Sequence, residues 1–236
     1  MITELTWDSN LFGFKVGIID PADLKSKSLE NHLKIAKESK FRLIYLNIIE
    51  NDYQLNSIAQ GNNGFLASQK QTYKMSLISS NAFENSPNVF LYTDENVSED
   101  LLILALQSGH MSKYKQDPVF TLDQFKRLYT IWIERSVRRE IADFVAVYQI
   151  GGKILGFITL LFKDHTGKIG LVGVDEKSRG KGIGRQLIQY VITQCSINKC
   201  SEISVVTQRD NLAAVGLYIK SGFSLFSTQN NYHFWL

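Results

Sequence analysis

Hydrophobic and polar positions along the first 80 residues alternate in a way that predicts short strands and helices in turn. Extended segments are expected at residues 12–19, 43–48 and 73–78, and helices at 22–39 and 52–60. Residues 79–88, which read SSNAFENSPN, are rich in turn-forming types and predict a domain boundary. We therefore expect an α/β domain at residues 1–85 and a second domain at residues 86–236.

The second segment begins with helical periodicity and continues with strands. Hydrophobic side chains recur at helical spacing over 98–106 and 122–139. Extended segments follow at 144–149, 154–162 and 169–174, the first two joined by Gly151 and Gly152, so we expect an antiparallel meander. The predicted pattern ends with a helix at 184–196, a strand at 203–207, a helix at 211–220 and a strand from Phe223.

The composition indicates a folded protein and argues against two classes of partner. The chain has 236 residues, of which 44% are hydrophobic, and this is enough for a buried core. Its net charge is only +3 and its 26 basic residues are scattered, so we expect a small polyanionic ligand and no nucleic acid. No basic and apolar leader opens the sequence, and the longest apolar run, 156–162, is too short to span a membrane. We expect a cytoplasmic protein with no membrane partner.

Metal ligands and disulfides are not expected. Cys195 and Cys200 are too few and too close together for a disulfide framework, and they lack the neighbouring His or Cys of a zinc site. The four histidines are dispersed without helical pairing. We therefore expect two free thiols and no metal cofactor.

A glycine-rich loop is the strongest local signal for binding. The segment RGKGIG at 179–184 follows a predicted strand and opens directly into an amphipathic helix. Glycines let backbone amides converge on one oxyanion, the helix N-terminus adds partial positive charge, and Arg179, Lys181 and Arg185 add full charges. A tight turn without a ligand is the alternative that the loop alone leaves open. The segment lacks the Lys-Ser or Lys-Thr of a Walker loop and the βαβ context of a dinucleotide site.

Two motifs in sequence order resemble the GNAT acetyltransferases. The strand, RGKGIG and helix at 169–196 look like motif A of that superfamily, and NLAAVGLYIKSGF at 211–223 resembles its motif B. The resemblance covers residues 88–236. It implies the GNAT fold, a mixed and mostly antiparallel α/β sheet that splays at its fourth strand and is flanked by helices, with acetyl-CoA as the co-substrate in the splay.

The resemblance also assigns residues to acetyl-CoA. The fourth strand would offer its backbone to the pantetheine and one amide to the thioester carbonyl, and the loop would hold the pyrophosphate. Asn211 would contact the pantetheine, although it is also a good helix N-cap. The residues expected to bind acetyl-CoA are Leu171, Val172, Gly173, Val174, Arg179, Gly180, Lys181, Gly182, Ile183, Gly184, Arg185, Asn211 and Leu217.

Tyr218 stands where many GNAT members place a tyrosine against the thioester sulfur. A phenol with a pKa of about 10 stays protonated at neutral pH and can donate to a departing thiolate, whose pKa is about 8.5. The resemblance therefore implies that Tyr218 is the general acid. The alternative is a core aromatic between Leu217 and Ile219.

Shorter motifs along nearly the whole chain resemble the TDP-fucosamine acetyltransferase family. They are LTWDSNLFG at 5–13, DPVF at 117–120, WIERSV at 132–137, VTQ at 206–208 and YHFW at 232–235. This resemblance implies an acceptor that carries its amine on a nucleotide-linked sugar, dTDP-4-amino-4,6-dideoxygalactose, made for a surface polysaccharide. It also puts the N-terminal domain on the substrate side. The aromatic residues Trp7, Phe12, Trp132 and Trp235 can equally be core residues.

The sequence leaves several points open. The amine must lose a proton to a side chain or to ordered water, and Glu134, Asp143 and His110 are candidate bases, with a solvated side chain as the alternative role. Candidate ligands for the acceptor's diphosphate are Lys113, Lys115 and Arg209. Acetylation of another amine, such as a protein N-terminus or another amino sugar, and a non-catalytic acyl-CoA-binding module are the alternative functions. The oligomeric state stays open, with a homodimer as one alternative.

Overall fold

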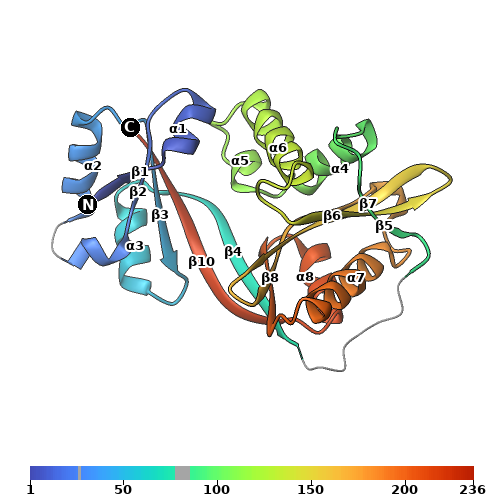
Figure 1. Ribbon diagram of the computed structural model, residues 1–236. Coiled ribbons are helices and arrows are strands. Elements are labelled where there is room, and N and C mark those ends of the chain that lie inside the picture. Colours follow the sequence, from blue (N-terminus) through green and yellow to red (C-terminus); the bar gives the residue numbers. More distant parts are fainter. Residues whose placement is uncertain (26–27, 78–85) are drawn as a thin grey trace.

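Ten strands of the described chain form one mixed sheet (Figure 1). The computed structural model describes residues 1–25, 28–77 and 86–236. The order across the sheet is β1-β2-β3-β10-β4-β9-β8-β7-β6-β5. The strands are β1 (Ile2–Glu4), β2 (Val16–Ile19), β3 (Leu43–Ile49), β4 (Phe65–Ser76), β5 (Val89–Leu91), β6 (Phe144–Ile150), β7 (Lys153–Lys163), β8 (Thr166–Val174), β9 (Glu202–Gln208) and β10 (Ser224–Trp235).

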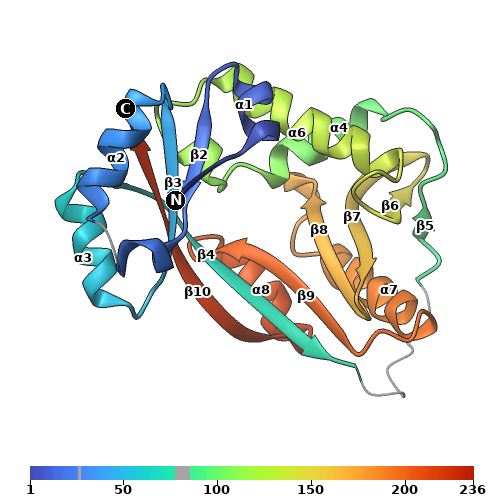
Figure 2. The same ribbon diagram turned by 60° about the vertical axis from the view of Figure 1, so that its left-hand side comes forward.

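Helices cover both faces of this sheet (Figure 2). Helices α4 and α6 pack on one face of β6–β8 and α7 packs on the other, while α2 and α3 lie against β3 on the face opposite to α1. The helices are α1 (Thr6–Phe12), α2 (Leu29–Glu38), α3 (Tyr53–Gly61), α4 (Glu99–Ser108), α5 (Lys113–Gln116), α6 (Leu122–Val137), α7 (Ile183–Ile197) and α8 (Leu212–Lys220), with 3-10 turns η1 (Pro21–Lys25) and η2 (Glu176–Ser178).

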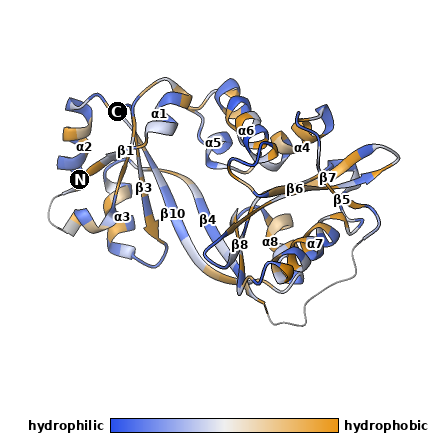
Figure 3. Ribbon diagram, in the orientation of Figure 1, coloured by the Kyte–Doolittle hydropathy of each residue, from blue (hydrophilic) through white to orange (hydrophobic). Residues whose placement is uncertain are grey.

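The hydrophobic core follows the period of each strand. On β3, Ile44, Leu46 and Ile48 pack toward α2 and α3, whereas Leu43 and Tyr45 pack toward α1 and α6. A strand buried on both faces reads as a continuous hydrophobic run, which is why β3 is evident in the sequence. Strands β4 and β10 differ, because both carry many hydrophilic positions (Figure 3).

Strands β8 and β9 are parallel and pair over only part of their length. Residues 166–169 of β8 pair with 202–205 of β9, although β8 continues to Val174 and β9 to Gln208. Residues 172–174 of β8 keep their pairing with β7 on the other side. The sheet therefore splays between residues 170–174 of β8 and residues 206–208 of β9, as the resemblance to the GNAT acetyltransferases implies.

The predicted antiparallel meander is confirmed as β6–β7–β8, but three other predictions were wrong. Phe12 ends α1 instead of starting a strand, because Gly13 takes a φ of +76° and its N–H bonds the Ser9 carbonyl, which closes the helix. The helix expected from residue 22 begins at Leu29, where Ser28 caps it. Strand β4 begins at Phe65, well before the expected residue 73.

The predicted domain boundary, residues 79–88, lies mostly outside the described residues, which stop at 77 and resume at 86. Strand β4, which precedes this segment, pairs with β9 and β10, which follow it. One sheet thus combines strands from both sides of the boundary, and the division into domains at 1–85 and 86–236 stays a prediction.

Candidate active site

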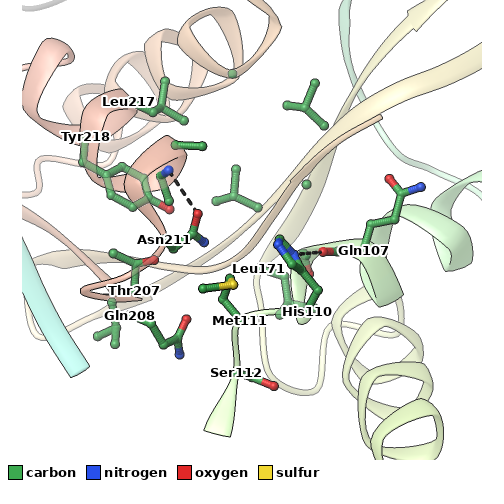
Figure 4. Close-up of a pocket in the computed structure, with 18 of the residues that line it drawn as sticks. Gln107, His110, Met111, Ser112, Leu171, Thr207, Gln208, Asn211, Leu217 and Tyr218 are labelled. Atoms are coloured by element: carbon green, nitrogen blue, oxygen red, sulfur yellow. Dashed lines mark hydrogen bonds between the residues drawn. The ribbon is translucent and has the colours of Figure 1, made fainter. Parts of the chain in front are cut away.

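A cavity of about 1040 Å³ lies where β8 and β9 separate, a size typical of small-molecule sites. Strand β8, the start of α7 and helix α8 form one part of its lining. Residues 107–114 and side chains of β3, β4 and β10 form the other part. Figure 4 shows Asn211 and Tyr218 on one side of this space and His110 and Met111 on the other.

Two glycines let β8 lie close to its neighbours. A Cβ added to Gly173 would stand 2.8 Å from the Leu104 carbonyl oxygen, and one added to Gly170 would stand 2.7 Å from Oγ1 of Thr159. The same Oγ1 accepts a 2.8 Å hydrogen bond from the N–H of Leu171, beside a register shift between β7 and β8. The backbone N–H of Leu171 is therefore held on the β7 side.

The loop between β8 and α7 contains two glycines with positive φ, +78° at Gly180 and +81° at Gly182. Other residues rarely adopt this conformation, which explains the glycines. Gly182 is the N-cap of α7, so the first N–H groups of the helix lie beside the cavity. Gly184 serves packing, because a Cβ there would lie 3.0 Å from Cδ2 of Leu217 on α8.

The residues expected to bind acetyl-CoA gather at this cavity with one exception. Lys181 is exposed and is not part of the lining. Arg179 donates from Nε to the Val174 carbonyl at 3.2 Å, which holds its side chain near the end of β8. The lining includes Leu171, Val172, Gly173, Val174, Arg179, Gly180, Gly182, Ile183, Gly184, Arg185, Asn211 and Leu217.

Asn211 caps α8, as the sequence predicts, and its contact with the pantetheine stays a prediction. Its Oδ1 accepts a 3.3 Å hydrogen bond from the N–H of Ala214 and so caps α8. The side chain also lines the cavity (Figure 4). Because the cap uses only the oxygen, the amide nitrogen can still donate to a ligand.

Tyr218 is 3% exposed and combines core packing with access to the cavity. Its ring centroid lies 6.1 Å from that of Tyr73 and 5.9 Å from that of Phe223. Figure 4 shows the ring extending from α8 toward Asn211. Burial raises the pKa of the Tyr218 phenol above its usual value, so the hydroxyl is protonated at neutral pH.

Comparison with known proteins identifies this architecture. Residues 110–223 match the model of the acetyltransferase (GNAT) family. The chain contains a GNAT acetyltransferase domain. A GCN5-related N-acetyltransferase from Sphaerobacter thermophilus has the same fold, with a TM-score of 0.63 at 16% identity over 93% of this chain and 73% of that one. The splayed sheet with flanking helices is thus the GNAT fold.

Two curated relatives indicate acyltransferase activity for the GNAT domain. The spore coat polysaccharide biosynthesis protein SpsD of Bacillus subtilis is 27% identical over 139 residues, 58% of this chain and 47% of SpsD. The match therefore spans about half the length of that relative. An acetyltransferase of Pectobacterium atrosepticum is 26% identical over 117 residues, 43% of this chain and 82% of that protein. The two matches support acyltransferase activity for the GNAT domain, whose family uses acetyl-CoA.

The cavity wall that faces the GNAT motifs is polar. Its residues on β3, β4 and β10 are Asn47, Ser68, Lys70 and Asn231, none of which the sequence analysis singled out. The spacing of Ser68 and Lys70 is the period of a strand, but the residues between and around them are polar too, so no hydrophobic face marks the strand.

Two of the short sequence motifs meet at a buried carboxylate beside this wall, on the same face of β3 and β10. Oδ2 of Asp117 accepts a 2.9 Å hydrogen bond from Nε1 of Trp235 and lies 2.6 Å from Nδ1 of His233. Burial lowers the pKa of His233 to about 4, although the hydrogen bond to Asp117 acts in the opposite direction. His233 is therefore neutral at pH 7 and donates its Nδ1–H to Asp117.

The four aromatic residues considered from the sequence have different surroundings. Phe12 is buried, and Trp235 is tied to Asp117, so both belong to the core. Trp132 lines the cavity, and Trp7 stacks on it with a centroid distance of 6.4 Å. Only Trp132 of the four can touch a ligand in the cavity directly.

Of the three candidate bases, only His110 lies at the cavity. His110 lines the cavity and bonds the Gln107 carbonyl through Nδ1 at 2.9 Å (Figure 4). Asp143 accepts a hydrogen bond from the Phe162 N–H, and Glu134 pairs with Arg138, the C-cap residue of α6. Neither carboxylate lines the cavity.

Of the three candidate ligands for the diphosphate, only one lies at the cavity. Lys113 lines the cavity. Lys115 is exposed, and Arg209 pairs with Glu50 and bonds Gln69, so both lie outside the lining.

Within residues 1–25, 28–77 and 86–236, the structure shows neither a cluster of metal ligands nor a helix that could span a membrane. No group of three or more His, Cys, Asp or Glu side chains there could hold a metal ion. None of the described helices is both long and apolar enough to cross a membrane. Cys195 and Cys200 are buried free thiols, as expected.

Proposed function

We propose that this acyltransferase moves the acetyl group of acetyl-CoA to the 4-amino group of a nucleotide-linked amino sugar, dTDP-4-amino-4,6-dideoxygalactose or a close analogue. The observation that carries the proposal is that the two sides of the cavity differ. One side consists of the glycine loop and the unpaired backbone edge of β8, and the other carries asparagine and lysine side chains. The name of SpsD, a spore coat polysaccharide biosynthesis protein, supports a role in making a surface polysaccharide.

The residues present fit acetyl-CoA. The splay leaves residues 171–174 of β8 with a strand edge that can pair with the pantetheine as with an added strand. The amides at Gly180, Gly182 and the start of α7 suit the pyrophosphate. Arg179 and Arg185 would add charge from within the lining, and Lys181 from the solvent side.

One backbone amide of β8 would polarise the thioester carbonyl. The N–H of Leu171 is engaged by Thr159 on the β7 side. Because backbone groups of successive residues in a strand point to opposite edges, the N–H of Val172 is directed toward the splay. We assign this amide to the carbonyl oxygen, on which negative charge grows as the amine attacks.

Tyr218 would complete the transfer. As the amine nitrogen bonds to the carbonyl carbon, the carbon–sulfur bond breaks, and the thiolate takes the phenolic proton of Tyr218. The raised pKa of this buried phenol keeps it protonated at neutral pH until the thiolate forms, and the phenolate left behind takes a proton back from solvent. The amine's own proton leaves to solvent or to His110, the candidate base that lines the cavity.

The test is turnover with dTDP-4-amino-4,6-dideoxygalactose beside its glucose epimer, followed by release of the CoA thiol. We expect turnover with the galactose form and about tenfold less with the epimer, because an axial-to-equatorial change moves the amine within a fixed site. A panel of other amines, including a peptide with a free N-terminus, runs in parallel. Turnover of a panel amine together with none of either sugar would refute the proposed acceptor.

A further inference from the structure

The polar wall of the cavity holds two lysines that the GNAT motifs do not include. We propose that Lys70 and Lys113 form an anion site that binds phosphate groups of the acceptor. The proposal rests on the proposed function, because it gives the acceptor its charged part. Together with the glycine loop, it gives the enzyme two places for phosphate groups, one for the pyrophosphate of acetyl-CoA and one for the phosphates of the acceptor.

The wall is a row of polar side chains in register across adjacent strands. Asn231 of β10 is paired with Asn47 of β3 on one side and with Ser68 of β4 on the other. Lys70 follows two residues after Ser68 on the same face of β4, and both line the cavity. Polar residues in the middle of a sheet are costly unless something polar meets them, so this row fits a hydrophilic ligand.

Lys113 comes to the same wall from α5. Its Nζ lies 3.4 Å from the ring centroid of Tyr45, which places the ammonium over β3. Tyr45 precedes Asn47 by two residues and therefore shares its face of the strand. Lys70 and Lys113 therefore lie on either side of the hydrogen-bonded pair Asn47 and Asn231, although they are 43 residues apart in sequence (113 minus 70).

Neither ammonium is neutralised by a direct ion pair within the described part of the chain. Lys113 feels the charges of Asp8 and Asp117 at longer range, and the positive charge of Lys70 acts on it in the opposite sense. Two half-buried positive charges that act on each other without a bridging carboxylate are stabilised by a bound anion.

An unpartnered oxygen in the same wall also indicates a ligand. Asn231 is 6% exposed, and its Nδ2 donates to Oδ1 of Asn47 at 2.7 Å. Its own Oδ1 is buried and has no partner among the described residues. An acceptor left unpaired at this depth is costly, and a ligand hydroxyl would satisfy it. The wall therefore suits a hydroxyl next to an anion, as in a sugar phosphate.

Phosphate is favoured over carboxylate by the side chains involved. The fork of arginine matches carboxylate and phosphate alike, so the choice between them rests here on charge, because a single carboxylate brings only one negative charge to two lysines. The lysines are two, and a diphosphate carries at least two negative charges at neutral pH. The acceptor we infer is therefore a diphosphate ester, which a nucleotide-linked sugar is.

The binding test uses the full-length protein saturated with CoA, so that the glycine loop is already filled. Thymidine diphosphate, inorganic pyrophosphate and glutamate are titrated by calorimetry into wild type and the variants Lys70→Met and Lys113→Met. We expect both diphosphates to bind and each variant to weaken them about tenfold or more. The controls are Lys74→Met, on the same strand but paired with Glu202, and Lys115→Met, exposed on the same helix; both should bind as wild type does.

Three outcomes would overturn the site: no diphosphate binding to the CoA-loaded protein, equal losses in the test and control variants, or glutamate binding as tight as that of pyrophosphate. Kinetics separate the site from the proposed function. If the amino sugar is turned over and its KM is unchanged in Lys70→Met and Lys113→Met, the function stands and the site falls. If thymidine diphosphate binds through the lysines but no amino sugar is acetylated, the site stands and the function falls.

Discussion

The hydroxyl of Tyr218 is the smallest group on which the proposed chemistry depends. Tyr218→Phe removes only this oxygen and leaves the ring packed against Tyr73 and Phe223. We predict that kcat falls about 10²-fold or more while acetyl-CoA affinity stays within a few-fold, which is the scale of a lost general acid. Steady-state rates at saturating substrates and a calorimetric Kd for acetyl-CoA measure the two effects.

An acyl donor with a more acidic thiol is the control for this prediction. A better leaving group needs less help, so the defect of Tyr218→Phe should shrink with such a donor. The melting temperature reports on packing in the same samples. A folded Phe variant with wild-type kcat would show that Tyr218 is a core residue and that water protonates the thiolate.

The lowered pKa of Lys113 predicts how binding at the polar wall depends on pH. Burial lowers the pKa of Lys113 to about 8. The negative charge of Asp8 acts to raise this pKa, and the positive charge of Lys70 lowers it further. The ammonium is present below this value, so diphosphate affinity should be highest below about pH 8 and fall as the pH rises through it. Lys113→Met should remove most of this fall, and calorimetry from pH 7 to pH 9.5 measures it.

Proton uptake gives a second measure of the same titration. A bound anion favours the charged form of Lys113, so binding near pH 8 should draw protons from the buffer, and two buffers of different ionisation heat reveal them. A pH-independent affinity in the wild type would contradict the assignment. The other groups that act on Lys113 are Asp8, Lys70 and Asp117, and the nearby phenols of Tyr45 and Tyr114 stay protonated because burial raises the pKa of each.

At the scale of elements, the loop that starts α7 should determine acetyl-CoA affinity. Gly182 combines a φ of +81° with a place in the cavity lining. Gly182→Val would force the backbone out of this conformation and put methyl groups where the pyrophosphate is proposed to lie. We predict a loss of acetyl-CoA affinity of at least about 100-fold by calorimetry, since several amide contacts would be lost together.

The hairpin between β6 and β7 supplies a matched control. Gly152 also has a φ of +81° and has open space around its Cβ position. Gly152→Val therefore carries the same backbone strain away from the cavity, and it should lower stability without changing acetyl-CoA affinity. If the two variants lost stability equally and both kept wild-type affinity, the loop would be only a tight turn.

The elements that the sequence predicts well are those with one clear hydrophobic period. Helices α6 and α7 and the meander β6–β8 are of this kind. Strand β4 fails because Ser68 and Lys70 face a cavity instead of a core, so the alternation that marks a strand is absent. The candidate site divides in the same way. The glycine loop and the motif with Tyr218 are continuous in sequence and could be recognised there, whereas the polar wall around Asn231 forms only when β3, β10 and β4 pair.

At the scale of the whole molecule, the contact of Asp117 with His233 and Trp235 fastens β10 to the segment before α6. The pKa of His233 falls from 6.5 to about 4 in the folded protein. A depressed pKa means that folding favours the neutral ring, so this stability is present above pH 6.5 and is lost as the pH falls toward about 4. We predict a loss on the order of 3 kcal/mol in the free energy of unfolding across that window.

Urea unfolding at pH 7, 6, 5 and 4 measures this dependence. His233→Gln cannot become charged, so its stability should fall less over the same range, even though it starts lower through the changed contact. His165→Gln, at an exposed turn, should follow the wild type. Identical slopes for wild type and His233→Gln would show that protonation of this ring does not destabilise the fold.

The position of β10 also bears on how the protein is made. Residues 224–235 leave the ribosome after every other strand of this sequence, yet they fill the gap between β3 and β4. Until they arrive, both neighbours expose open edges, the condition in which nascent chains depend on chaperones. Asn231 enters with this strand, so a partly synthesised chain can display the glycine loop and still lack a complete polar wall. Among the described strands, β10 therefore completes the polar wall last, and a chain that lacks β10 lacks part of the cavity lining.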